Sequence, residues 1–409
     1  MAHIVIIGGG VAAGTAAKTL RKEQFPGDIT VLTEEPHPPY QRPPLSKGYL
    51  AGKEGADAVI LQPEQWYAEQ SIDLRMSTRA VDLDPAAHEL ELDDGSVLRY
   101  DSALLAMGAS ARSLPLEGAD LPGVRTLRRL DDADDLAAEL RGGGKRLVII
   151  GSGWIGMEVG ATARTLGNEV TVLARDPVPL AVALGAEMGE VFAALHREHG
   201  VDLRTSVNVE RITGGERAEA VVVDGEPVPA DIVLIGVGAV PNTALAEAAG
   251  LRIHDGILAD SSLRTGAPDV YTAGDVANPY HPVIQRHLRS EHWANAQHSG
   301  PVAARGMLGE PASFAEIPYF YTDQFDLSME LSGYAPLMSD AQVVVRGDRD
   351  RREFVAFWMD HGRVVAGMNV NVPKVNKAVQ ALIRSGGIVN VESLRDPSIP
   401  LESLVEEEH

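Results

Sequence analysis

The sequence contains no cysteine among its 409 residues. This absence excludes disulfide bonds, thiolate nucleophiles, cysteine-ligated iron–sulfur clusters and cysteine-rich zinc sites, and no metal site is expected. The sequence also lacks any run of about 18 apolar residues, so no membrane-spanning helix is expected. Basic residues are in short supply: 36 Lys and Arg against 58 Asp and Glu give a net charge of −22. Because so acidic a chain repels phosphates, nucleic acid and anionic membranes are not expected partners.

The remaining composition is that of an ordinary globular protein, with 44% hydrophobic and 23% charged residues. The length predicts two or three domains on a prior of about 150 residues per domain. The N-terminal segment is too polar after Ile7 and too rich in glycine for a secretory signal peptide. We therefore expect a cytoplasmic protein, either a monomer or a homodimer.

Two segments share one pattern, residues 3–34 and residues 146–175. Each has a short β-branched run, a glycine turn, an alanine-rich stretch with helical periodicity and a second β-branched run. This order predicts a strand–turn–helix–strand unit, present twice. The first runs, IVII and LVII, are continuously apolar, as in parallel strands that are covered on both faces.

The pattern along the chain predicts an α/β fold with two Rossmann-like nucleotide-binding domains and a C-terminal α+β domain. Residues 1–109 and 234–315 are expected to form one split domain, with residues 110–233 inserted as the second. Residues 316–409 differ in character, because runs such as QVVVRG, REFVAFWM and GRVVAGMNVN alternate in a way that predicts an antiparallel meander. A helix is expected to follow in KAVQALIRSG.

The first glycine turn has the features of a dinucleotide site. Gly8 permits a sharp turn, Gly10 allows the backbone to approach a pyrophosphate, and Ala13 keeps the helix close to the strand. The second strand of the unit ends in Glu34 and Glu35, whose carboxylates can accept hydrogen bonds from ribose hydroxyls.

The second turn contains the full pattern Gly151, Gly153 and Gly156. Its second strand is followed by Arg175 rather than by a carboxylate, and an arginine favours the 2′-phosphate of NADPH. Arg175 is equally well explained as a solvated surface charge, so NADH and NADPH both stay open.

The segment EEPHPPYQRPPLSKGYL at residues 34–50 resembles the FAD-dependent ferredoxin reductases of oxygenase and cytochrome P450 systems, to which rubredoxin reductases and the apoptosis-inducing factor group are related. Further similar motifs are LLAMGASAR, GSGWIGMEVGATA, GVGAVPN, TGAPDVYTAGDVA, RSEHWANA and PYFYTDQFD, which span essentially the whole chain. The resemblance implies a glutathione-reductase-like arrangement: an FAD domain split by an NAD(P)H domain, plus a C-terminal domain.

The resemblance also implies which residues bind FAD. They are Gly8, Gly10, Ala13, Glu34, Glu35, Arg42, Lys47, Ala80, Asp275, His292 and Trp293. Arg42 is a permanent cation for the diphosphate. Asp275 is expected to present a carboxylate to the ribityl hydroxyls, and a helix N-cap role is compatible with that. Ala80 would contribute only its backbone, and Trp293 is also explained as a core residue.

Lys47 and Glu158 are, by the same resemblance, the catalytic pair. A lysine near flavin N5 would stabilise electron density on the reduced ring, and Glu158 would hold the lysine and contact the nicotinamide. The alternative is a structural ion pair. Gly238 would border the nicotinamide, Glu291 could hydrogen-bond it, and Tyr321 stands near the flavin where the family frequently has tryptophan.

With no internal redox thiol, electrons must leave to an external acceptor. The expected reaction is hydride transfer from NADH or NADPH to FAD, followed by single-electron transfer to an iron–sulfur ferredoxin. Docking is expected near Arg286, Arg289 and the C-terminal domain, where basic residues offset the overall negative charge. Two alternatives stay open: an NAD(P)H oxidase or quinone reductase (diaphorase) without a protein acceptor, and a redox-sensing binding protein of the apoptosis-inducing type.

Overall fold

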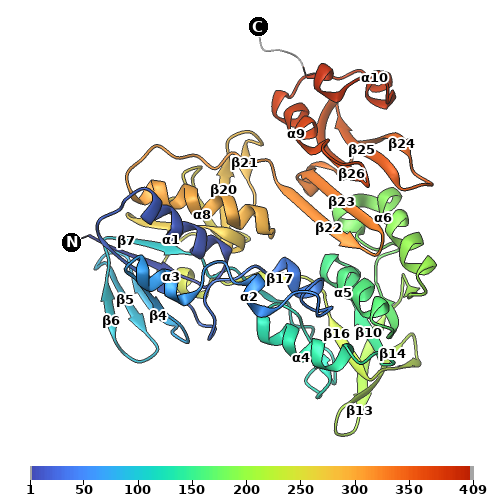
Figure 1. The fold of residues 1–409 in the computed structure, drawn as a ribbon, viewed down its shortest axis with the longest axis horizontal. Helices are drawn as coiled ribbons and strands as arrows, with labels where there is room; N and C mark the ends of the chain where they lie inside the picture. Colours follow the sequence, from blue (N-terminus) through green and yellow to red (C-terminus); the bar gives the residue numbers. More distant parts are fainter. Residues whose placement is uncertain (1, 406–409) are drawn as a thin grey trace. The chain divides into compact units, whose positions relative to one another are not determined.

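A computed structural model describes residues 2–405 of the chain. These residues form two compact units, and each contains one of the two strand–turn–helix–strand segments (Figure 1). The first unit comprises residues up to Arg42 together with Gly55–Ser110 and Ala239–Glu316. The second comprises Pro43–Glu54, Ala111–Gly238 and the described residues from Ile317 onward. The division into three domains that the sequence suggests stays a prediction.

A five-stranded parallel sheet forms the centre of the first unit. Its strand order is β19 (Val270–Thr272), β7 (Ser102–Leu105), β1 (His3–Ile7), β2 (Asp28–Leu32) and β3 (Ile72–Arg75). The apolar runs are buried from Ile4 to Ile7, as strands covered on both faces require. Helix α1 (Val11–Lys22) packs with α8 (Trp293–Met307) over one face. The other face packs against the antiparallel sheet of β4 (Ala80–Asp84), β5 (Glu89–Leu92) and β6 (Val97–Arg99).

The second unit repeats this plan. Its parallel sheet has the order β12 (Asp202–Arg204), β11 (Glu169–Leu173), β10 (Arg146–Ile150), β16 (Ile232–Ile235) and β9 (Val124–Arg125). An antiparallel meander of β13 (Val209–Gly214), β14 (Ala218–Val223) and β15 (Glu226–Pro229) covers one face, as β4–β6 do in the first unit. The helices of this part are α4 (Leu130–Leu140), α5 (Trp154–Thr165) and α6 (Ala181–Glu198).

The C-terminal part of the second unit is an antiparallel sheet. Its order is β22 (Tyr319–Gln324), β23 (Leu327–Gly333), β26 (Arg363–Val370), β25 (Glu353–Asp360) and β24 (Gln342–Asp348). Helices α9 (Asn376–Ser385) and α10 (Val391–Arg395) follow. The predicted meander and helix are confirmed, and with them the fold class of two Rossmann-like sheets plus a C-terminal α+β part.

The shorter elements complete the chain. They are α2 (Ala56–Val59), α3 (Glu64–Glu69), α7 (Ala244–Ala248), the paired strands β8 (Ala109–Ala111) and β17 (Ala239–Pro241), the small sheet of β18 (Ile257–Ala259), β20 (Ala277–His281) and β21 (Arg286–His287), and the 3₁₀ turns at Pro43–Ser46, Gly274–Val276, Ala335–Leu337 and Leu401–Leu404. Within residues 2–405, no helix is both long and apolar enough to cross a membrane.

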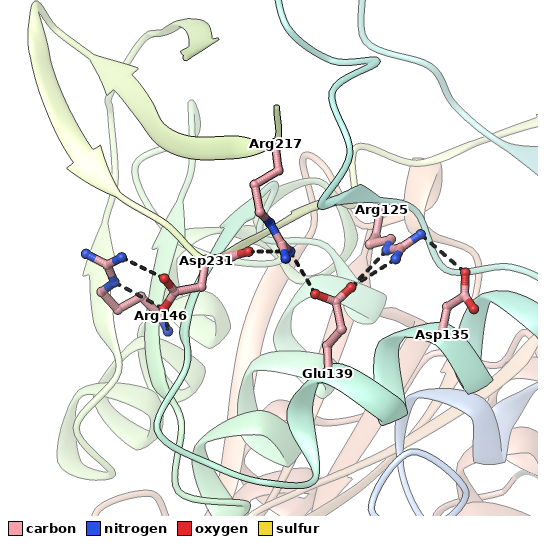
Figure 2. Close-up of polar contacts among 6 residues, drawn as sticks. All are labelled: Arg125, Asp135, Glu139, Arg146, Arg217 and Asp231. Carbon is pink, nitrogen blue, oxygen red and sulfur yellow. Dashed lines mark hydrogen bonds and ion pairs between the residues drawn. The ribbon is translucent and has the colours of Figure 1, made fainter. Parts of the chain in front are cut away.

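An ion-pair network fastens the meander and α4 to the sheet of the second unit (Figure 2). Glu139 on α4 lies 2.9 Å from Arg125 on β9 and 2.9 Å from Arg217, which precedes β14. Arg217 also donates to the backbone carbonyl of Asp231 at 3.0 Å. The Asp231 carboxylate in turn pairs with Arg146 at 2.6 Å. One carboxylate bridging two guanidinium groups thus joins three segments that are far apart in sequence.

Candidate functional site

The first glycine turn leaves β1 with the geometry that a phosphate needs. Gly8 has a φ of +135°, and a Cβ there would lie 2.1 Å from the carbonyl oxygen of Ala106. Gly10 precedes α1, whose first turn has no side-chain cap, and a Cβ at Gly10 would meet nothing within 4 Å. Ala13 is fully buried against the core. The helix therefore presents unpaired backbone N–H groups beside open space.

The loop after β19 lies beside the same helix. Gly274 has a φ of +76°, and a Cβ there would lie 3.1 Å from the Cβ of Ala12 in the first turn of α1. Asp275 follows directly, in the turn Gly274–Val276. Because β1 and β19 belong to one parallel sheet, their carboxyl ends meet at the same edge, and Asp275 is brought next to the glycine turn.

Arg42 and Glu35 form a partly buried polar cluster with Tyr40. The Tyr40 hydroxyl donates to Glu35 at 2.5 Å, and Arg42 donates to the Tyr40 hydroxyl at 2.8 Å and to Glu35 at 3.1 Å. Burial lowers the pKa of Arg42, but Tyr40, Glu35 and Asp275 raise it above the ordinary value overall. Arg42 is therefore a fixed cation, and Glu35 holds it in place. Glu34 is exposed.

The segment RSEHW adjoins Asp275. Arg289 pairs with Asp255 at 3.0 Å and with Glu291, and it donates to the backbone carbonyl of Asp275 at 3.4 Å. His292 is the N-cap of α8, because its Nδ1 accepts from the backbone N–H of Ala294 at 3.2 Å. Arg289 thus ties this segment to the turn that carries Asp275.

Two further residues of the expected FAD set have less distinctive surroundings. Trp293 begins α8 and packs partly buried against the core of the first unit. Ala80 begins β4 in the antiparallel sheet, where it pairs with Leu92. The structure thus groups Gly8, Gly10, Ala13 and Asp275 around the first turn of α1, whereas Ala80 is placed in a separate sheet.

The second unit repeats the glycine turn. Gly151 has a φ of +111°, and a Cβ there would lie 2.3 Å from the carbonyl oxygen of Gly236. A Cβ at Gly156 would lie 2.4 Å from the carbonyl oxygen of Gly151, so helix α5 can pack this closely only with glycine at that position. Gly153 precedes α5, which has no side-chain cap, and a Cβ at Gly153 would meet nothing within 4 Å.

Gly238 and Arg175 lie beyond the carboxyl ends of β16 and β11, the two strands that flank β10 in this sheet. Gly238 follows β16, has a φ of +107°, and its carbonyl accepts from the backbone N–H of Arg112 at 2.9 Å. Arg175 follows β11 and is exposed. No carboxylate of the described residues pairs with its guanidinium group, whereas the neighbouring Arg204 pairs with Asp202 at 2.7 Å. Arg175 is therefore available to an anionic ligand.

Lys47 and Glu158 are in contact, and both belong to the second unit. The Lys47 Nζ lies 3.0 Å from Oε2 of Glu158, with side chains 18% and 4% exposed. Ser46 also donates to Oε2, and the Thr322 hydroxyl donates to Oε1 at 2.6 Å. A carboxylate this deeply buried requires such compensation, and three donors supply it. Lys47 of the expected pair directly follows the 3₁₀ turn Pro43–Ser46 and Glu158 lies on helix α5, while strand β22 contributes Thr322 to their surroundings.

Tyr321 completes this cluster. Its ring lies under the Lys47 ammonium, 5.5 Å from Nζ to the ring centroid, a cation–π geometry. Burial, together with the nearby Glu158 carboxylate, raises the pKa of the Tyr321 phenol. Tyr321 thus lies at the same site as Lys47 although it comes from the C-terminal sheet.

Sequence reasoning missed Ser46, Thr322, Gln324 and His196 as parts of this cluster. Ser46 and Thr322 contact Glu158 directly, and Gln324 donates to Thr322 at 3.2 Å. His196 on α6 contacts Gln324 at 2.8 Å. The alternation of Thr322 and Gln324 about the exposed Asp323 is a sequence signal for two polar residues on one strand face. Nothing in the sequence indicates which helices pack against that face of the strand.

The arginines near the expected docking surface differ in availability. Arg286 is exposed on the hairpin of β20 and β21, and the described residues supply no ion-pair partner for it. The Arg289 side chain is only 12% exposed and is neutralised by Asp255 and Glu291. In the C-terminal sheet, Arg349 and Arg352 pair with Glu187 and Glu198 of α6. Of these, Arg286 is the surface charge that remains open to a partner.

Comparisons with known proteins agree with this geometry. Residues 2–300 match the family model described as pyridine nucleotide-disulphide oxidoreductase, and residues 319–405 match the one described as reductase C-terminal. The chain is 37% identical over 407 residues to "Probable ferredoxin reductase CtmF" of Castellaniella defragrans, covering 98% of each chain. It is 36% identical over 405 residues to the biphenyl dioxygenase system ferredoxin–NAD(+) reductase component of Paraburkholderia xenovorans, again covering 98% of each chain.

Among solved structures, the covalent putidaredoxin reductase–putidaredoxin complex contains a chain with a TM-score of 0.94 and 31% identity. The match covers 99% of this chain and 98% of that chain. The resemblance to ferredoxin reductases, drawn from motifs in the sequence, is confirmed across the whole length. The chain is a member of the pyridine nucleotide-disulphide oxidoreductase family.

Proposed function

We propose that this protein is an FAD-dependent NAD(P)H:ferredoxin reductase that supplies electrons to an oxygenase system. The observation that carries the proposal is the presence of two dinucleotide-type glycine turns together with an ion pair between Lys47 and the buried Glu158, in a chain without cysteine. The relatives named above are reductase components for ferredoxins and run the full length of the chain. Such a protein works in the cytoplasm, where NADH and NADPH are available.

The residues of the first unit fit FAD. The uncapped first turn of α1 and the open space at Gly10 suit the diphosphate, and Arg42 supplies a fixed positive charge. Asp275 offers a carboxylate beside the same turn for hydroxyl groups. Glu35 contacts Arg42 and Tyr40, so its role is to orient Arg42, while Glu34, which is exposed, would contribute the carboxylate that faces a ribose.

The residues of the second unit fit a pyridine nucleotide. Gly151, Gly153 and Gly156 provide the turn and an uncapped helix, and Gly238 lies at the adjacent strand end. Arg175, an exposed cation at the position where a carboxylate would repel a 2′-phosphate, makes NADPH acceptable.

When bound, FAD accepts two electrons as a hydride and releases them one at a time, which is what one-electron iron–sulfur acceptors require. Lys47 places a positive charge where negative charge develops on reduction, and its contact with Glu158 holds the ammonium in one position. Glu158 accepts from three donors and so keeps both oxygens oriented. These residues act by orientation and electrostatics, with no proton relay to solvent required.

The domain boundaries of the proposed enzyme follow the family arrangement. Residues 1–109 and 234–315 would form the FAD domain, 110–233 the NAD(P)H domain and 316–409 the C-terminal domain. The ferredoxin would dock over Arg286, where an exposed cation stands on an otherwise acidic chain.

The test is reduction of cytochrome c by NADH or NADPH with and without added ferredoxins at moderate salt. Ferredoxin-dependent reduction by the purified flavoprotein supports the proposal. Rapid oxygen or quinone reduction with no stimulation by any ferredoxin would instead identify an oxidase or diaphorase.

The matched variant is Arg286→Glu. It should raise KM for ferredoxin several-fold and leave KM for NADH unchanged. Arg289→Glu is unsuitable for this purpose because it would strand the carboxylates of Asp255 and Glu291. Equal effects of Arg286→Glu on both substrates would refute docking at this hairpin.

A further inference from the structure

A chain of buried polar side chains ends on the catalytic-pair carboxylate. His196 Nε2 lies 2.8 Å from Oε1 of Gln324, Gln324 Nε2 donates to Oγ1 of Thr322 at 3.2 Å, and the Thr322 hydroxyl donates to Oε1 of Glu158 at 2.6 Å. The exposed fractions of these four residues are between 0% and 3%. This series of hydrogen bonds therefore runs from helix α6 through strand β22 to helix α5, almost entirely shielded from solvent.

Strand β22 makes this arrangement possible because its side chains alternate. Thr322 and Gln324 are two residues apart and lie on one face, whereas Asp323 between them is exposed on the other. The strand is held in register by β23, where Thr322 pairs with Met329 and Gln324 with Leu327. Two polar side chains are thus directed from the C-terminal sheet into the interior of the second unit.

The hydrogen bonds have one direction. A glutamine amide donates through nitrogen and accepts through oxygen, so Gln324 donates to Thr322 and must accept from His196. A hydroxyl has one proton, and a hydroxyl that accepts from Gln324 keeps that proton for Glu158. Each donor in the series therefore points toward the carboxylate.

This direction fixes the state of His196. Its Nε2 must carry a proton to donate to Gln324, and burial lowers the pKa of the imidazole to about 4, so the ring is neutral. Its Nδ1 is buried with no hydrogen-bond partner among the described residues. A lone pair there is tolerated, whereas an unpaired N–H would be costly.

We propose that Gln324 and His196 are positioning residues for the Lys47–Glu158 pair. They keep the Thr322 hydroxyl oriented so that it donates its hydrogen bond to Oε1 of Glu158, and Oε2 then stays directed at Lys47. The inference rests on the catalytic role proposed for that pair. It assigns a role in the reaction to His196 on α6 and Gln324 on β22, which reach Glu158 only through the Thr322 hydroxyl. Without Gln324, the Thr322 hydroxyl is free to rotate away from the carboxylate.

The kinetic test measures the rate constant for flavin reduction by NADH in anaerobic stopped flow with the FAD-loaded protein. Thr322→Val removes the hydroxyl and should lower this rate constant about tenfold, because a buried hydrogen bond to a charged group is lost. Thr322→Ser keeps a hydroxyl and should restore it to within about twofold. Gln324→Leu, which acts only through Thr322, should lower it about threefold.

The decisive variant combines Thr322→Val with Gln324→Leu. If Gln324 works through the Thr322 hydroxyl, the double variant should be no slower than Thr322→Val alone, since interaction through one group is not additive. The matched control is His199→Gln on the next turn after His196, where the ring stacks on Phe325 but contacts neither Gln324 nor Thr322. It should leave the rate constant unchanged.

A second measurement is independent of activity. Histidine ¹⁵N NMR, with the His196 signal assigned by its loss in His196→Phe, should show a neutral ring protonated at Nε2 whose N–H exchanges slowly with water. Gln324→Leu should raise that exchange rate at least tenfold, because the acceptor is removed. Thermal unfolding of each variant confirms that the protein being compared is folded.

Three results would overturn the inference. These are an additive loss in the double variant, failure of Thr322→Ser to restore the rate constant, and a His196 ring protonated at Nδ1 only. Each is read from flavin reduction or from NMR, and neither measurement involves ferredoxin. Loss of the proposed function shows itself separately, as a wild-type protein whose flavin is reduced normally but passes no electrons to any ferredoxin.

Discussion

The buried, neutral His196 predicts a specific pH dependence of stability. The ring is fully buried, and burial first, with the nearby His199 also contributing, lowers its pKa to about 4 although Gln324 opposes the shift. An unfolded histidine has a pKa of about 6.5. Between these values the unfolded chain binds a proton that the folded chain does not. Stability from this group is therefore complete above about pH 6.5 and falls as the pH falls toward 4.

The size of the effect follows from the two pKa values. Linkage over a difference of about 2.5 pKa units gives a loss of about 2.5 kcal/mol at pH 4.5 relative to pH 7.5. His196→Phe removes the titrating group but leaves Oε1 of Gln324 without its donor, which costs about 1–2 kcal/mol at all pH values. The wild type should therefore be more stable than the variant at pH 7.5, and this advantage should disappear or reverse at pH 4.5.

Urea unfolding of both proteins at the two pH values measures this difference. Tryptophan fluorescence is a suitable signal, since Trp154 contacts Phe192 on α6 with a centroid separation of 6.1 Å. Every other titrating group is common to both proteins and cancels in the comparison. A difference in free energy of unfolding that is the same at pH 7.5 and pH 4.5 would refute the assignment of a neutral, buried His196.

Three other predictions concern the second unit. Glu139→Gln should cost about 1 kcal/mol at neutral pH, because Arg217 and Arg125 outweigh burial and lower the Glu139 pKa. In urea unfolding this cost should begin to fall below the unfolded pKa of about 4.3 and be lost once the pH is below the depressed folded pKa. Gly153→Val should weaken NADH binding by isothermal titration without changing the melting temperature, whereas Gly156→Ala should lower the melting temperature by several degrees; the opposite pattern would contradict the assigned glycine roles. Arg175→Glu should raise KM for NADPH at least tenfold and KM for NADH less than twofold, and equal changes would show that Arg175 does not contact a 2′-phosphate.

The fold was largely predictable because its signals are local. The apolar runs beginning at Ile4 and Leu147, each followed by a glycine turn, indicate strands of parallel sheets, and both lie where expected. The alternation in residues 342–370 likewise indicates the antiparallel strands that are observed. Strand order was not predictable, since the placement of β9 and β19 at the edges of their sheets depends on long-range packing.

The candidate site was predictable only in part. Lys47 and Glu158 are 111 residues apart, and their contact was expected from resemblance to a family rather than from spacing. Glu35 was expected to face a ribose, but its contacts with Tyr40 and Arg42 depend on how the loop after β2 folds back. The contribution of Thr322 required knowledge of which helices β22 packs against, and no local pattern contains that information.

The origin of Thr322 and Gln324 in the C-terminal sheet has a consequence for protein engineering. The last ninety or so residues look separable, since they match a family model of their own. A chimaera that exchanges them for those of another reductase would also replace Thr322 and Gln324 beside Glu158. A mismatched side chain there would then face Glu158 on α5 and His196 on α6, which now hydrogen-bond to Thr322 and Gln324. Partner specificity is therefore better altered by grafting exposed loops than by replacing this segment whole.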